Sequence, residues 1–176
     1  MTGWTTHLTA GTHLAPEDGT CLMEAVSSVT GDTWTDAPSS THLLLAHLAR
    51  LVNDAVSDER RDDLAAFIPD LIDTNNPDPS VHARLAVVCT SYALTVSDSP
   101  SLRRLRHSAE RRIGELRRPR PDLPHLDVIR RWTFEHGTAR RAVETSVAHC
   151  EKRGDDELIG LLAAASTVVP RRLTAG

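Results

Sequence analysis

The sequence predicts an all-α fold, a helical bundle of about seven to eight helices that form one domain or two helical units sharing one interface. Apolar residues recur three and four positions apart along most of the chain, which is typical of amphipathic helices. No run of alternating apolar and β-branched residues bounded by turns indicates a central strand. Since aromatic residues make up 3% of the chain, we expect a core of Leu, Val and Ala between closely spaced helices.

The chain begins with a Thr- and Gly-rich segment, residues 1–15, which has no helical period and is expected to be an arm or a short extended stretch. Pro16 and the two acidic residues after it introduce the first helix. Asp18 or Thr20 is the expected N-cap, and Gly31 is the expected C-terminal stop. The apolar stripe of this helix is Leu22, Ala25, Val26 and Val29.

Two further helices are expected before a hinge. Ser and Thr residues at the end of the loop 31–41 cap a longer helix that runs to about Val56. Asp58 caps a third helix, which Pro69 interrupts. The segment DTNNPDP, residues 73–79, is rich in helix breakers and is the expected hinge. The core face of the longer helix is Leu44, Leu48, Leu51, Val52 and Ala55.

After the hinge, apolar residues at helical spacing predict a helix over about 81–96. The segment SDSPS, residues 97–101, ends it and caps an Arg-rich helix that extends to about Arg118. The stripe of the first helix is Val81, Leu85, Val88, Cys89, Tyr92 and Val96. The stripe of the second is Leu102, Leu105, Ala109, Ile113 and Leu116.

A Pro-rich segment at residues 118–124 is expected to be a second linker. The next helix runs from about His125 to a stop at Gly137, and another follows it to Arg153. A last helix covers about 156–169.

Charge is distributed unevenly along the chain. Residues 1–100 carry fourteen acidic residues and four Arg, whereas residues 101–176 carry ten acidic and sixteen basic residues. We therefore divide the chain into an acidic N-terminal helical unit, 1–75, and an Arg-rich C-terminal helical unit, 76–176, which could be one domain. Such asymmetry is typical of proteins with an anionic partner. The alternative is that the acidic half docks on the basic half, within one chain or across a homo-oligomer.

The composition predicts a protein of the cytoplasm. Three widely spaced cysteines, Cys21, Cys89 and Cys150, cannot all pair, which favours reduced thiols. The apolar runs are too short for a membrane span, and the N-terminus has no basic stretch followed by an apolar one. We expect neither disulfides nor a membrane contact.

Three segments carry a resemblance to bacterial proteins: EDGTCLMEA at 17–25, GDTWTDAP at 31–38 and THLLLAHLARLVNDAVSDE at 41–59. Around these segments, over about residues 12–75, the chain resembles a family of uncharacterised bacterial proteins, many of them actinobacterial, whose shared core is D-G-T-C-L-M-E-A. The resemblance implies no activity, cofactor or catalytic residue. It implies only that the N-terminal part is a coherent unit.

Cys21 has two interpretations. In the first turn of a helix, free N–H groups and the helix dipole favour a thiolate, which would make Cys21 reactive. Three carboxylates, those of Glu17, Asp18 and Glu24, oppose this by raising the thiol pKa. The first basic residue of the chain is Arg50, so no local cation offsets them. We therefore favour a buried, structural Cys21.

The alternative function is a small cysteine- or metal-dependent enzyme or modification protein. In it Cys21 is the nucleophile or a metal ligand, His42 or His47 is the base, and Glu24 orients that base. No C-x-x-C motif, H-E-x-x-H motif or His pair at i, i+4 indicates a metal site, and we assign neither a metal nor a cofactor. Gly-rich phosphate loops and G-x-S-x-G are also missing from the sequence.

The other signal of function in the sequence is the Arg-rich helix. Residues 101–120 hold eight Arg and two Glu, and with the preceding helix they resemble a helix-turn-helix in outline. Arg donates two parallel hydrogen bonds to a phosphate or carboxylate. The alternative is a solvated or intersubunit face, because Glu110 and Glu115 can pair with neighbouring Arg. The candidate residues are Arg103, Arg104, Arg111, Arg112 and Arg118.

The function that the sequence favours is therefore that of a helical interaction protein. It binds an anionic partner, an acidic protein surface or duplex nucleic acid, through this Arg-rich helix. Such binding should weaken steeply with salt.

Overall fold

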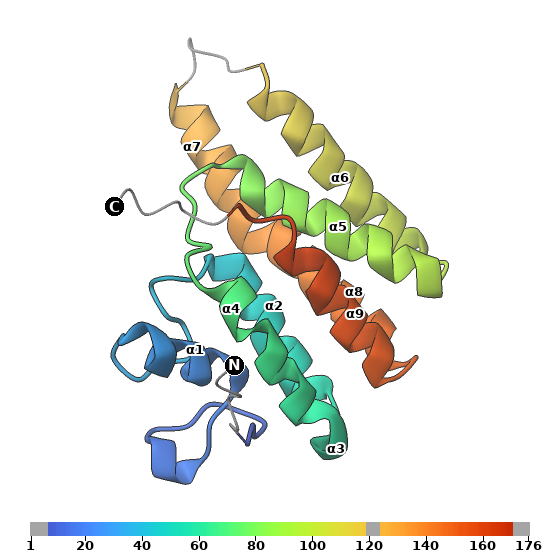
Figure 1. Ribbon diagram of the computed structural model, residues 1–176. Coiled ribbons are helices and arrows are strands. Elements are labelled where there is room, and N and C mark those ends of the chain that lie inside the picture. Colours follow the sequence, from blue (N-terminus) through green and yellow to red (C-terminus); the bar gives the residue numbers. More distant parts are fainter. Residues whose placement is uncertain (1–6, 119–123, 171–176) are drawn as a thin grey trace.

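The computed structural model describes residues 7–118 and 124–170, and the regular secondary structure of these residues is helical, with no strand (Figure 1). The predicted all-α helical bundle is confirmed. No helix within the described residues is long and apolar enough to cross a membrane. The α-helices are α1 (Leu22–Thr30), α2 (Leu43–Ala55), α3 (Asp58–Arg61), α4 (Ile68–Leu71), α5 (Ser80–Val96), α6 (Pro100–Leu116), α7 (Pro124–Thr133), α8 (Arg140–Glu151) and α9 (Asp155–Ser166). Short 3₁₀-helices cover Pro16–Asp18 and Asp62–Phe67, and a π-helix covers Phe134–Ala139.

One cluster of buried apolar side chains runs through the molecule and includes residues on both sides of the 73–79 hinge. Helix α5 packs on α6, α8 and α9, and α2 packs on α8 and α9. In Figure 1, α1 and the N-terminal loop lie beside one side of this bundle, and α6 lies on the other. Small side chains allow the helices to approach closely. The buried alanines include Ala46, Ala49, Ala83, Ala86, Ala93, Ala109, Ala139, Ala142 and Ala165.

Helix α1 begins later than the sequence predicts. Its N-cap is Cys21, and the expectation of Asp18 or Thr20 is wrong. Thr20 is instead paired with the N-terminal segment: the Thr9 N–H donates to the Thr20 carbonyl at 2.9 Å, and the Thr20 N–H donates to Thr9 Oγ1 at 2.8 Å. This pairing keeps Thr20 outside the helix.

Tertiary contacts also decide how α2 begins. Its N-cap is His42 rather than one of the preceding Ser or Thr residues. The Thr41 hydroxyl donates to the Leu71 carbonyl at 3.0 Å, and the His42 N–H donates to Thr74 Oγ1 at 3.1 Å. The start of α2 is therefore joined to the end of α4. Pro69 lies in the first turn of α4, where its missing N–H costs no helical hydrogen bond.

The expected helix stop at Gly137 is wrong. The backbone of Thr133 and that of Arg140 are both right-handed helical, and the π-helix Phe134–Ala139 joins α7 to α8 without a break. Gly137 lies within this wider turn. A π-helix closes i→i+5 hydrogen bonds and often occurs at functional sites.

Gly160 on α9 permits a close contact between α9 and α5. A Cβ atom at this position would lie 2.0 Å from the hydroxyl oxygen of Tyr92 on α5, whereas a Cβ at Gly114 on α6 would meet no atom within 4 Å. We expect Gly160→Ala to lower the free energy of unfolding by about 1–3 kcal/mol, because the extra methyl overpacks the α5–α9 contact.

The matched control, Gly114→Ala, should instead raise the free energy of unfolding by about 0.5–1 kcal/mol, because Ala has the higher helix propensity. Urea denaturation followed by circular dichroism measures both values. Equal effects of the two substitutions would contradict the proposed packing of Gly160.

Candidate functional site

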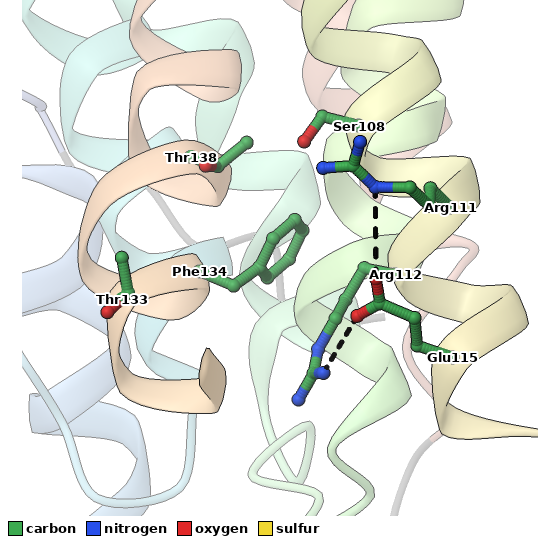
Figure 2. Close-up of a pocket in the computed structure, with 7 residues that line it drawn as sticks. All are labelled: Ser108, Arg111, Arg112, Glu115, Thr133, Phe134 and Thr138. Atoms are coloured by element: carbon green, nitrogen blue, oxygen red, sulfur yellow. Dashed lines mark hydrogen bonds and ion pairs between the residues drawn. The ribbon is translucent and has the colours of Figure 1, made fainter. Parts of the chain in front are cut away.

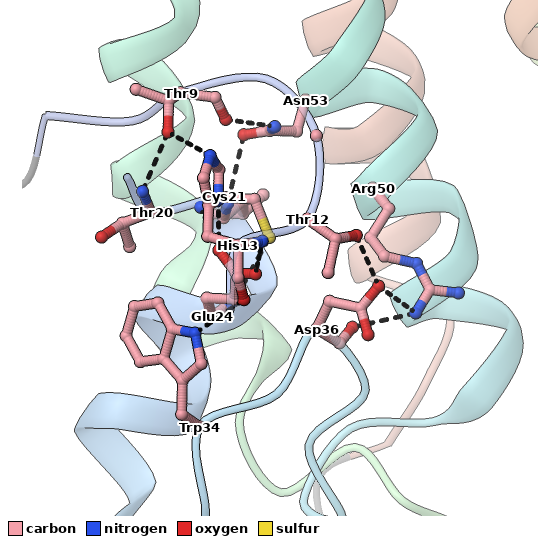
Figure 3. A network of polar contacts seen from close by, with 12 residues as sticks. Thr9, Thr12, His13, Thr20, Cys21, Glu24, Trp34, Asp36, Arg50 and Asn53 are labelled. Atoms are coloured by element: carbon pink, nitrogen blue, oxygen red, sulfur yellow. Dashed lines mark hydrogen bonds and ion pairs between the residues drawn. The ribbon is translucent and has the colours of Figure 1, made fainter. Parts of the chain in front are cut away.

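Cys21 and Glu24 form a capping box at the start of α1 (Figure 3). The Glu24 backbone N–H donates to Cys21 Sγ at 3.5 Å, and the Cys21 N–H donates to the Glu24 carboxylate at 2.7 Å. The Cys21 side chain is 1% exposed, and its burial raises the pKa of the thiol to about 12. The thiol is therefore protonated at neutral pH and serves as a helix cap.

The Glu24 carboxylate is fully buried and holds the N-terminal loop on α1. It accepts hydrogen bonds from the His13 backbone N–H at 2.6 Å and from His13 Nδ1 at 2.8 Å, in addition to the one from Cys21. Burial alone would raise the pKa of Glu24, but the donors from Cys21 and His13 hold it below its usual value. The other ring nitrogen of His13, Nε2, lies 3.0 Å from Thr9 Oγ1.

This cluster differs from the one that the enzyme hypothesis requires. The structure brings Cys21 and Glu24 together, but the imidazole beside them is that of His13. His42 is the N-cap of α2 and packs against His82, whereas His47 lies within α2 and lines a separate pocket described below.

We expect Cys21 to resist alkylation in the folded protein. Burial also raises the thiol pKa of Cys89 to about 12 and that of Cys150 to about 11, so these two are internal references. Site-resolved mass spectrometry after iodoacetamide treatment at neutral pH should find the three thiols unlabelled until denaturant unfolds the chain. Rapid labelling of Cys21 alone in the folded state would contradict a structural role and support the enzyme hypothesis.

We expect Glu24→Gln to lower the free energy of unfolding at neutral pH by about 2 kcal/mol, since hydrogen bonds to a charged acceptor are the stronger kind. Because folding lowers the Glu24 pKa below 4.5, its charge stabilises the fold above that pH, and the stabilisation is lost as pH falls through the folded pKa. The difference between wild type and variant should therefore shrink in acid. Urea denaturation across this pH range measures it, and a constant difference would contradict the role of the charge.

A second feature is the arginine groove, which we define as two cavities along the interface of α6 with the π-helix and α8. One has a volume of about 330 Å³ and the other of about 250 Å³. The first is lined by Ser108, Arg111, Arg112, Glu115, Thr133, Phe134 and Thr138 (Figure 2). The second is lined by Ser101, Arg104, Leu105, Arg141 and Thr145. From the second cavity to the first, the residue numbers increase along α6, whereas those on the opposite side of the groove decrease. The two sides of the groove therefore run antiparallel.

The 250 Å³ cavity carries uncompensated positive charge. Arg104 and Arg141 both line it, and neither forms an ion pair with any carboxylate of the described residues. The hydroxyl-bearing residues Ser101 and Thr145 line the same cavity. Two guanidinium groups and two hydroxyls are all donors suited to an anion.

The 330 Å³ cavity carries a smaller excess of positive charge. Arg111 and Arg112 share one carboxylate, that of Glu115, at 3.8 Å and 3.2 Å (Figure 2). The Arg112 residue is 7% exposed, so its guanidinium is held in place by the surrounding packing. One carboxylate for two guanidinium groups leaves a net positive charge beside the Phe134 ring.

The five predicted arginines thus separate into two groups. Arg104, Arg111 and Arg112 line the arginine groove. Arg103 forms an ion pair with Asp98, and neither Arg103 nor Arg118 lines either cavity. The sequence analysis missed the opposite side of the groove, whose only signal is the spacing of Thr138, Arg141 and Thr145 on one helical face.

A third feature is the histidine pocket, a cavity of about 140 Å³ between α2, α5 and the π-helix. His42, which is 3% exposed, packs edge-on against His82 at 4.5 Å between ring centroids. Burial and the charge of His82 lower the pKa of His42 to about 4. Burial likewise lowers the pKa of His47 and of His82. The pocket is lined by Leu43, Leu44, His47, Arg50, His82, Glu135, His136 and Arg140.

Among residues 7–118 and 124–170, no group of three or more His, Cys, Asp or Glu side chains is arranged to hold a metal ion. Comparison of the chain with known protein families, curated proteins and solved structures finds no match. The geometry of the three clusters is therefore the basis for any functional conclusion.

Proposed function

We propose that the protein binds an acidic segment of a partner protein in the arginine groove and acts as a helical interaction protein. The observation that carries the proposal is the pair Arg104 and Arg141, which face one cavity without a carboxylate partner among the described residues. Both residues are exposed, so their guanidinium groups are accessible to an anion that enters the cavity they line. The planar guanidinium groups suit a carboxylate, which accepts two parallel hydrogen bonds.

The spacing along α6 supports a ligand with several charges. Arg104 and Arg111 are seven residues apart, which is about 10.5 Å along a helix. A peptide in the polyproline II conformation has three residues per turn and rises about 3.1 Å per residue, so carboxylates three residues apart lie on one face about 9 Å apart and span the two cavities. Hydroxyl-bearing residues Ser101 and Ser108 recur at the same seven-residue spacing and supply further donors.

The form of the groove favours a polypeptide over duplex nucleic acid. The uncompensated arginines line cavities between two helices, where a slender chain fits better than a broad duplex. Elsewhere on α6, Arg103 pairs with Asp98, and Arg106 pairs with Glu110 at 3.1 Å. Such paired charges release few counterions and contribute little to nucleic-acid binding.

The cysteines support a reducing location for this interaction. Cys21, Cys89 and Cys150 are all free and buried. We therefore propose the cytoplasm as its place.

We expect a fluorescently labelled peptide with Glu at every third position and Gly between to bind in a fluorescence-anisotropy titration at low ionic strength, and to bind more weakly as salt increases. Arg104→Ala and Arg141→Ala should each weaken binding about tenfold, which corresponds to about 1.4 kcal/mol. The matched control is Arg103→Ala, which removes the same charge from the neighbouring position and should change affinity by less than about twofold.

Three results would contradict the proposal: no saturable binding, an equal loss from Arg103→Ala, or tighter binding of a duplex oligonucleotide. Sedimentation of the protein alone at low salt completes the test. Salt-sensitive self-association that Arg104→Ala abolishes would identify a second copy of the chain as the acidic partner instead.

A further inference from the structure

We propose that the histidine pocket binds a small, neutral phenolic molecule. The histidine pocket and the 330 Å³ cavity lie on different sides of the π-helix. Glu135 and His136 line the histidine pocket, whereas Phe134 and Thr138 line the 330 Å³ cavity. It shares no lining residue with the arginine groove. The inference is therefore independent of the proposed function.

The size of the pocket sets the size of the ligand. Its volume is about 140 Å³. An engineered apolar cavity of ~150 Å³ in another protein binds benzene, so a volume of this order accepts one six-membered ring. Two fused or linked rings exceed it.

The walls of the pocket suit an aromatic ring. Leu43 and Leu44 are aliphatic, and the three imidazole rings of His47, His82 and His136 are flat surfaces. The Trp132 indole stacks on His136 with 5.0 Å between ring centroids, and Trp132 is 63% exposed. Leu43 is also exposed, which leaves an apolar entrance for a ring to cross.

The charges around the pocket are compensated, which favours a neutral ligand. Arg50 lies 3.2 Å from the Asp36 carboxylate, and Arg140 lies 2.9 Å from that of Glu144. The third charged lining residue, Glu135, lies 2.9 Å from Arg131. An anion or a cation would have to disrupt one of these ion pairs. In its balance of charge the histidine pocket differs from the arginine groove, where positive charge is in excess.

The hydrogen bonds of two imidazoles indicate that the ligand donates one. His136 Nδ1 donates to the Trp132 carbonyl at 3.0 Å, so Nε2 of the neutral ring carries a lone pair. His47 Nε2 donates to the Glu144 carboxylate at 3.2 Å, which likewise leaves Nδ1 as an acceptor. Within the described residues no donor is paired with either acceptor, and a phenolic hydroxyl can donate to one of them.

The test is isothermal titration calorimetry of the full chain at neutral pH with three ligands, each of which has one six-membered aromatic ring. Phenol carries the hydroxyl, toluene replaces it with a methyl group, and benzoate replaces it with an anion. We expect phenol to bind saturably and at least about tenfold more tightly than toluene or benzoate, because only phenol satisfies an imidazole acceptor without adding charge. Equal affinities for phenol and toluene, tighter binding of benzoate, or no saturable binding of phenol would overturn the proposal.

Variants locate the site. His136→Phe keeps a flat ring but removes the acceptor, so it should weaken phenol about tenfold and leave toluene unchanged. Leu43→Trp fills the entrance from an exposed position and should abolish phenol binding while the circular dichroism spectrum stays the same. His107→Phe, on the exposed side of α6, is the matched control and should change neither. Unchanged phenol binding in both pocket variants would place the ligand elsewhere and overturn the proposal.

Discussion

Close contact between helices through small side chains is the constraint on which the rest of this structure depends. With 3% aromatic residues, the chain fills its core with Leu, Val and many Ala, and the contact between Gly160 and Tyr92 leaves no room for a methyl group. Helices that approach this closely bury only a narrow stripe of each surface. Long polar side chains such as Arg104 and Arg112 then flank the stripe and line the hollows beside it.

Helical periodicity was sufficient to predict the all-α fold, because a buried stripe recurs at three and four residues wherever a helix packs. The ends of helices were less predictable. Thr9 holds Thr20 outside α1, and Thr74 binds the backbone of His42 at the start of α2. Gly137 continues a helix because the backbone widens into a π-turn around it. Each outcome depends on a partner or a backbone state that local sequence patterns do not contain.

In the candidate sites, too, the local sequence predicted some features, whereas others depend on tertiary contacts. The arginines of α6 are concentrated in one sequence segment, so composition alone revealed them. Arg141 lies on a different helix, and only the antiparallel arrangement of α6 and α8 brings it to Arg104. The same holds for the imidazoles: His47 and His82 come from helices on opposite sides of the hinge and meet only in the folded chain. Residue type predicted the chemistry, whereas tertiary structure decided which residues share a site.

The π-helix makes the length of its segment as important as its composition. Each residue of a helix turns the next by about 100°, so removing one residue from Phe134–Ala139 would restore regular α-helix and rotate α8 by that angle relative to α7. Val143 and Val147, now buried, would then turn away from the core. A single-residue insertion or deletion in this segment would therefore disturb the packing of α8 even where every buried side chain is retained.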